Sequence, residues 1–381
     1  MLKEVIFMPQ PATHYWVTKI ALADSDNPVF KDFFNKYKNY IALGTSAPDL
    51  FYFPLMPTVK TECKNFYWDG IADLIHHGRT YDLFCELLDK AKKLKTNNTK
   101  DNAEKLLAFA IGFYCHVITD CIFHPYVYRS TDDDWATGAG SFLSNIEENI
   151  AEYKHKYHEC LIDAGVKETF HLEFDKDDWN CPEETNNELL DFTIANAFYS
   201  ILKKIYPDCM PPEFHNPHDK NHPIQQAYSA LLQTITLLFE GKKILSFQSD
   251  NIIKTITETG EFFYSENFFD DIYPDCDSLP PYSPHDLFNF SCAVTRRIYE
   301  VVQGFWNDTT SKTAKEYFEN ESTNYLNAGN WNLDTGIQCE FNNTQELHQG
   351  NEKMNEAHID TLTNNYNIFN ELYKKLFGND N

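Results

Sequence analysis

The chain has 381 residues, a formal net charge of −25, and 42% apolar and 15% aromatic residues. This length allows one large domain or two ordinary ones, with enough apolar material for a sizeable core. Nucleic-acid partners are not expected, because binding to a phosphate backbone relies on clustered Lys and Arg, whereas the 32 basic residues here are scattered among 57 acidic ones.

The N-terminal residues show no signal-peptide pattern, since residues 1–11 lack an apolar h-region and a small-residue cleavage site. The sequence contains no run of 18 apolar residues, so no transmembrane segment is predicted. We therefore expect a cytoplasmic protein whose ten cysteines are reduced. Cys85, Cys115, Cys121 and Cys292 lie in apolar helical contexts and are expected to be small core residues.

Helical periodicity dominates the chain, and alternation with a period of two is scarce. In chain order, helices are predicted over 15–22, 74–94, 103–128, 141–161, 187–205, 225–240, 284–307 and 357–376. The Pro- and Asp-rich connections predict long surface loops, although a domain boundary near 275–283 is an alternative. We predict an all-α fold and one domain over residues 1–381, in which 284–381 is a helical C-terminal extension. Segment 309–351 has no legible pattern.

The most informative segment is the apolar run 108–125, which places His116, Asp120 and His124 four residues apart. On a helix, this spacing projects the three side chains from one stripe. Burying them without partners costs several kcal/mol, whereas a Zn²⁺ ion accepts both imidazole nitrogens and carboxylate oxygens. The alternative is a set of core histidines bonded to carbonyls, with Asp120 capping a neighbouring helix. The triplet favours the metal site.

Three other segments carry polar residues of the same kind. His14 begins a predicted helix beside Thr13, a candidate N-cap. Asp49 lies in a Gly/Pro turn that could aim its carboxylate into a cleft as a base, and an ordinary turn or cap role is an equal alternative. His76 follows an apolar pair and is expected to face inward, while the adjacent His77 faces outward.

The segment 141–161 supplies a candidate carboxylate ligand, Glu147, beside the predicted buried stripe. A pair of glutamates on a helix is more often solvated, so the segment alone does not indicate a ligand. His155 lies further round the same predicted helix. A Pro-rich segment without helical register is interpreted as a polar surface loop and contains His215, His218 and His222.

Four motifs in this order resemble a known family. They are His14-Tyr-Trp-Val, Gly44-Thr-Ser-Ala-Pro-Asp49-Leu-Phe-Tyr, His76-His-x-x-Thr80, and Gly112-x-x-x-His116-x-x-x-Asp120-x-x-x-His124-Pro. Together they resemble the zinc-dependent phospholipase C family, the helical enzymes that include clostridial alpha-toxin. The resemblance covers about residues 12–150 and implies a multi-helix phospholipase C-like domain.

The resemblance implies a cleft with up to three metal ions, built by motifs within 1–160. It assigns the candidate ligands as follows: His76, His116 and Asp120 to one ion, His124 and Glu147 to a second, and His14 with Asp120 to a third. Asp49 matches the carboxylate that acts as the base for the attacking water. The clustered ions would bind the phosphodiester oxygens and lower the pKa of a bound water.

The chain departs from the family pattern in three places. The family has a His four residues before the Glu that matches Glu147, and here that position is Leu143. Secreted members use a processed N-terminal amino group as a ligand, which this chain is not expected to supply. They also carry a C-terminal β-sandwich, whereas residues 240–381 read as helical here.

The leading hypothesis is therefore a metal-dependent phosphodiester hydrolase of phospholipase C type. In it, a zinc-activated water attacks a phospholipid or a small phosphodiester, with one to three Zn²⁺ ions bound. The alternative is a degenerate, non-catalytic helical protein with one structural zinc site, and Leu143 is the feature that favours it. Zinc content per chain would discriminate between the two.

Overall fold

The computed structural model is helical apart from two short pairs of strands, which confirms the all-α prediction. It describes residues 11–23, 27–55, 68–97, 99–130, 175–183, 186–207, 216–240, 284–320, 330–333 and 337–339, together with 159, 162–163, 165–167 and 170. The described residues share one hydrophobic core, which extends from α1 to Leu333. Whether the whole chain is a single domain stays a prediction.

The helices in chain order are α1 (Pro11–Ala23), α2 (Pro28–Thr45), α3 (Trp68–His77), α4 (Thr80–Thr96), α5 (Lys100–Ser130), α7 (Phe192–Ile205), α8 (Pro223–Glu240), α12 (Pro284–Asn307) and α13 (Ala314–Asn320). Three 3₁₀ helices are η1 (Pro48–Phe51), η2 (Phe53–Leu55) and η5 (Lys176–Trp179). The antiparallel strand pairs are β1 (Pro182–Glu183) with β2 (Asn186–Leu190), and β3 (Asn330–Asn332) with β4 (Ile337–Cys339).

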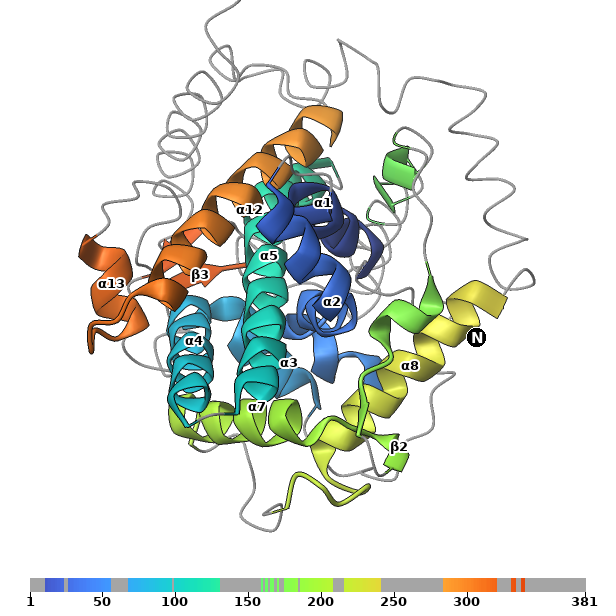
Figure 1. Cartoon of the computed structure of the whole chain (residues 1–381). Coiled ribbons are helices and arrows are strands. Elements are labelled where there is room, and N and C mark those ends of the chain that lie inside the picture. Colours follow the sequence, from blue (N-terminus) through green and yellow to red (C-terminus); the bar gives the residue numbers. More distant parts are fainter. Residues whose placement is uncertain are drawn as a thin grey trace, which may run out of the picture.

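Helix α5 is the centre of the fold, with α2 and α4 packed along it and α12 crossing it (Figure 1). Every described side chain from Leu106 to His124 is buried, as expected for a helix that is apolar on all sides. The stretch Lys100–His124 is long and apolar enough to cross a membrane by length and composition, yet its most apolar 18-residue window is fully buried inside the protein. Burial in the core therefore accounts for its apolar character.

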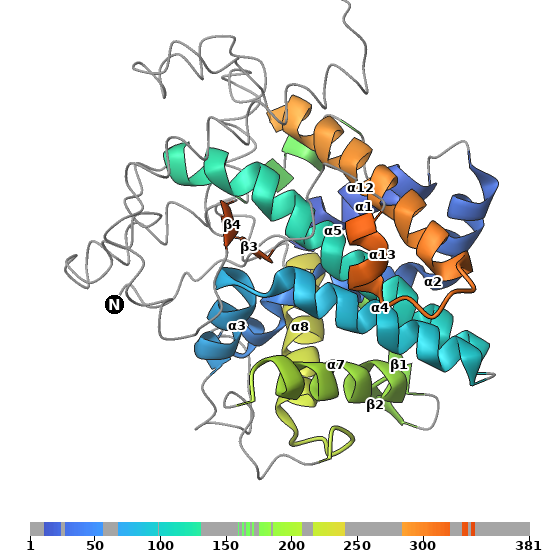
Figure 2. The ribbon, with the colours of Figure 1, turned by 90° about the vertical axis from the view of Figure 1, so that its left-hand side faces the viewer.

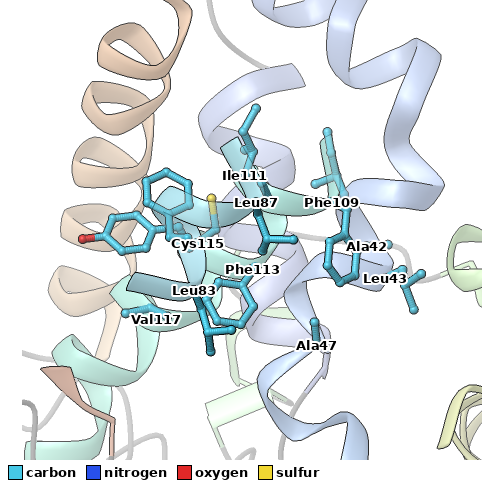
Figure 3. Packing of buried hydrophobic residues seen from close by; sticks show 14 of the residues in the cluster. Ala42, Leu43, Ala47, Leu83, Leu87, Phe109, Ile111, Phe113, Cys115 and Val117 are labelled. Carbon is cyan, nitrogen blue, oxygen red and sulfur yellow. The ribbon is translucent and has the colours of Figure 1, made fainter. Parts of the chain in front are cut away.

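Helices α2 and α5 approach each other closely where Gly44 lies against Gly112. A Cβ atom on Gly44 would lie 2.2 Å from the carbonyl oxygen of Phe109, which is too close for any side chain. Figure 3 shows Ala42 and Ala47 close to Phe109 and Phe113 around this crossing. The two glycines thus let the helix backbones touch, and this brings η1, which follows α2, next to α5.

The predicted helices over 103–128, 225–240 and 284–307 are confirmed. The predicted helix over 74–94 is wrong in one respect, because the chain breaks between α3 and α4 at Arg79, which has a φ of 61°. The prediction over 187–205 is wrong at its start, where residues 186–190 form strand β2 before α7.

Helix α2 was not predicted, although the local signals for it are present. Asn27 caps it by accepting a hydrogen bond from the Val29 N–H, and Pro28 occupies its first turn. The helix also contains a kink at Tyr37, which interrupts the periodicity. The predicted helices over 141–161 and 357–376 lie outside the described residues, apart from Glu159, which is helical.

Candidate metal centre

Seven buried ionisable side chains meet beside the C-terminal half of α5. They come from α1, η1, α3, α5 and the short described stretch around 159, and they are His14, Asp49, His76, His116, Asp120, His124 and Glu159. Each is at most 8% exposed. Because burying unpaired charges and imidazoles is unfavourable, so many in one place indicates a functional site.

Three of the histidines are oriented by backbone carbonyls. The Nδ1 atoms of His76, His116 and His124 lie 2.9, 2.8 and 2.6 Å from the carbonyl oxygens of Ala72, Thr45 and Leu333, respectively. A carbonyl oxygen can only accept, so each Nδ1 carries the hydrogen. In the neutral rings, the lone pair is therefore on Nε2, the nitrogen that binds a metal.

The Nε2 atoms of these histidines point at carboxylates. His76 Nε2 is 3.0 Å from Asp49 Oδ1, and His116 Nε2 is 2.7 Å from Asp120 Oδ2. His124 Nε2 is 3.3 Å from Glu159 Oε1. A lone pair and a carboxylate repel each other unless a cation lies between them, either a proton on the ring or a metal ion.

Two groups of donor atoms are compact enough to hold an ion, with all atoms of each group within 4.8 Å of one another. One comprises Asp49, His76 and His116, and the other comprises His14, His116 and Asp120. Imidazole nitrogens and carboxylate oxygens are the donor set of zinc sites. His116 Nε2 has no hydrogen-bond partner despite its short distance to Asp120, and so is available to a metal ion.

The pKa shifts follow from burial and from the mixture of charges. Burial lowers the pKa of His14 to about 4, assisted by the neighbouring His116, whose ring stacks on it at 4.0 Å. His14 is therefore neutral at pH 7, which is the state a ligand needs. Burial alone would raise the pKa of Asp120, but the surrounding imidazoles lower it well below its usual range. Asp120 is an anion throughout the physiological range.

His116 shows the opposite balance. Burial acts to lower its pKa, but the carboxylates of Asp120 and Asp49 outweigh burial and raise the pKa above its usual value. The site therefore attracts positive charge to this position. A divalent ion would supply that charge more completely than one proton, because it would meet several carboxylates at once.

The structure brings the predicted residues together in a different grouping from the one expected. His14, Asp49, His76, His116, Asp120 and His124 all face the cluster. Among the described residues, His14 and Asp120 lie in one compact group, as the resemblance implies, whereas the compact group of His76 and His116 contains Asp49 in place of Asp120. Glu147 and Leu143 lie outside the described residues, so the assignment of Glu147 stays a prediction.

Glu159 was missed by sequence reasoning. It is 7% exposed and lies beside His124, the place assigned to Glu147. Its signal was available: His155 precedes Glu159 by four residues, the same spacing as in the α5 triplet. Four residues further along the chain, Asp163 accepts hydrogen bonds from the Thr13 N–H and hydroxyl. Asp163, rather than Thr13, therefore caps the first turn of α1 and ties it to this stretch.

These features define an α-helical protein with a buried histidine–carboxylate centre suited to metal binding. The family model described as zinc-dependent phospholipase C matches residues 13–207, just over half of the chain. The chain belongs to the zinc-dependent phospholipase C family. No curated protein and no solved structure matches it. The matched region includes all seven clustered side chains, whereas α8, α12, α13 and the β3–β4 pair lie beyond it.

Proposed function

We propose that the protein is a zinc-dependent hydrolase of phospholipase C type that acts on a phospholipid or a small phosphodiester. This proposal rests mainly on one observation: in the centre, imidazole rings point their Nε2 atoms at carboxylates. His76, His116 and His124 each use Nδ1 on a carbonyl and direct Nε2 at an acid. Core packing provides no reason for three such pairs, whereas bound cations do.

The ligand sets follow from the rule that one Nε2 lone pair binds one ion. His116 belongs to both compact groups but can serve only one of them. His76 with Asp49 then supports one ion, and His14 with Asp120 supports another. His124 with Glu159 supports a third, to which His155 would add a nitrogen by its spacing. This gives up to three ions.

When bound, zinc would neutralise charge on the phosphodiester oxygens and lower the pKa of a bound water. The protein groups then manage the protons. Asp49, buried at 3% exposure beside His76, takes the proton from the attacking water. The water oxygen forms the new bond to phosphorus as the bond to the leaving oxygen breaks. The proton passes to that leaving oxygen, so the products are an alcohol and a phosphomonoester.

A phospholipid substrate and a cytoplasmic location are parts of this proposal that rest on the sequence. The five described cysteines, Cys85, Cys115, Cys121, Cys181 and Cys292, are buried thiols, which is compatible with a reducing compartment. The non-catalytic alternative rested on Leu143 as a missing ligand. Glu159 beside His124 supports a different register, so this alternative now becomes an outcome of the experiment.

The experiment combines elemental analysis with an assay of short-chain phosphatidylcholine hydrolysis. The assay measures the phosphorylcholine that is released. The wild type should hold two or three Zn²⁺ per chain, and chelation should abolish hydrolysis. Asp120→Asn should lower both zinc content and activity. The matched control is Asp178→Asn, since Asp178 is equally buried but pairs with Lys38 and Tyr15 outside the centre. One structural zinc without hydrolysis would instead support the non-catalytic alternative.

A further inference from the structure

The backbone of Leu333 connects two of the clustered histidines. Its N–H donates to the carbonyl oxygen of His76 at 2.7 Å, and its carbonyl oxygen accepts from His124 Nδ1 at 2.6 Å. Leu333 lies 209 residues from His124 in the chain and well beyond the family match, which ends at residue 207. A single residue of the C-terminal region thus contacts two elements of the metal centre.

Leu333 is held firmly in place. Its side chain is fully buried, and it directly follows β3, which pairs with β4 in antiparallel register. Strand β3 in turn packs against α3, α4 and α5, as Figure 2 shows. The peptide groups of Leu333 therefore present a donor and an acceptor at defined positions.

Each of the two hydrogen bonds has a specific consequence for the centre. The carbonyl oxygen accepts from His124 Nδ1, which sets the tautomer with the lone pair on Nε2, facing Glu159 and Asp120. The N–H satisfies a carbonyl in the last turn of α3, where helical carbonyls lack partners within the helix. This holds the end of α3, and with it His76, against the centre.

His124 differs from the other two oriented histidines in which part of the chain supplies the carbonyl that accepts from its Nδ1. His76 donates to Ala72 in its own helix, and His116 donates to Thr45, which the α2–α5 crossing places nearby. Both acceptors lie within the family-matched region. The acceptor for His124 comes from outside it.

We propose that Leu333 is a positioning residue for the metal centre, so that the β3–β4 segment completes a site whose ligands all lie in the family-matched region. This rests on the proposed metal centre. Loss of a backbone or carboxylate partner of a ligating histidine commonly lowers metal affinity or activity by about 10- to 100-fold. We expect an effect of this size when a substitution at Leu333 disturbs the position of its backbone.

The test compares Leu333→Ala with Leu88→Ala in the full chain. Both leucines are fully buried, but Leu88 lies in α4, which carries none of the clustered residues. Zinc affinity is measured by competition with a chromophoric chelator, and melting temperature is measured on the zinc-free proteins. Both variants should have a lower melting temperature, because each loses most of a buried side chain. Only Leu333→Ala should bind zinc about 10- to 100-fold more weakly.

Two additions separate positioning from a general loss of packing. Leu333→Met keeps an apolar side chain of similar volume and should restore zinc affinity. In the Co²⁺-substituted proteins, Leu333→Ala should alter the visible absorption bands, which report ligand geometry, and Leu88→Ala should not. If Leu333→Ala does not fold, the milder pair Leu333→Val and Leu88→Val is compared in the same way.

The outcomes separate this proposal from the proposed function. Wild-type zinc affinity and an unchanged cobalt spectrum in the Leu333 variant, alongside a zinc-binding wild type, would overturn the positioning role alone. A wild type that binds no zinc would overturn both. Selective weakening in the Leu333 variant, with rescue by Met, supports the positioning role whether or not phospholipid is the substrate.

Discussion

Gly44 of α2 and Gly112 of α5 face each other at the crossing of the two helices. A Cβ atom on either would lie 2.9 Å from the Cα of the other, and a Cβ on Gly112 would lie 2.1 Å from the carbonyl oxygen of Ile41. The contact is coupled to the metal centre: Thr45, next to Gly44, accepts the hydrogen bond from His116, which lies one turn after Gly112. The spacing between two backbones therefore sets the position of a candidate ligand.

Gly44→Ala should destabilise the protein by about 3 kcal/mol or more, at or beyond the upper end for overpacked cores, because the clash is with backbone atoms. Gly78→Ala is the matched control, since a Cβ there would meet nothing within 4 Å. Denaturant unfolding measures both. A Gly44→Ala variant as stable as wild type would show that the helices can separate freely.

Asp49→Asn should lower phosphodiester hydrolysis by at least about a hundredfold, because an amide cannot take the proton of the attacking water. The amide oxygen of Asn is a weaker zinc ligand than the carboxylate in the His76 group, so hydrolysis is compared per bound zinc at saturating Zn²⁺. Steady-state kinetics and elemental analysis are measured together, with Asp178→Asn as the control for a buried acid outside the centre. Full activity in Asp49→Asn would remove Asp49 from the mechanism.

Glu159→Gln and Glu147→Gln distinguish the two possible registers of the second carboxylate. Glu159 lies 3.3 Å from the Nε2 atom of His124, so its amide variant should lose about one zinc per chain and most activity. Glu147→Gln should keep both if Glu159 is the ligand. The reverse pattern would restore the original assignment. On the Glu159 register, Leu143→His should add no zinc.

His222 should make stability depend on pH. Burial lowers its pKa from 6.5 to about 4, so the unfolded chain binds a proton more readily than the folded one between these values. The contribution of neutral His222 to the free energy of unfolding is fully present above about pH 6.5 and is lost as the pH falls toward 4. At pH 5 the loss is about 2 kcal/mol.

The variant that tests this effect is His222→Asn. His222 Nδ1 accepts from the Ile224 N–H at the start of α8, and Asn can cap a helix in the same way without titrating. The drop in melting temperature between pH 7 and pH 5 should be smaller in the variant than in wild type. Equal drops would exclude His222 as the source. Its burial at 1% exposure also corrects the interpretation of this position as part of a polar surface loop.

The local parts of the fold and the site could be predicted from the sequence. Helices α5, α8 and α12 follow from periodicity, because helical hydrogen bonds join residues close in the chain. The spacing of His116, Asp120 and His124 identified the candidate centre for the same reason. The order of the four motifs identified the family, which the match over residues 13–207 confirms.

Only the tertiary structure decided which groups meet across the chain. Packing of β3 brings Leu333 to His124, and the Gly44–Gly112 crossing brings Thr45 to His116, with no local pattern marking either acceptor. A carbonyl occurs in every residue, so its role as a partner depends entirely on where the backbone passes. Glu159 is one of several acidic residues in this part of the sequence, and Glu147 was selected from the sequence instead. Its contact with His124 distinguishes it, because a ligand is selected by distance in space rather than by position in the chain.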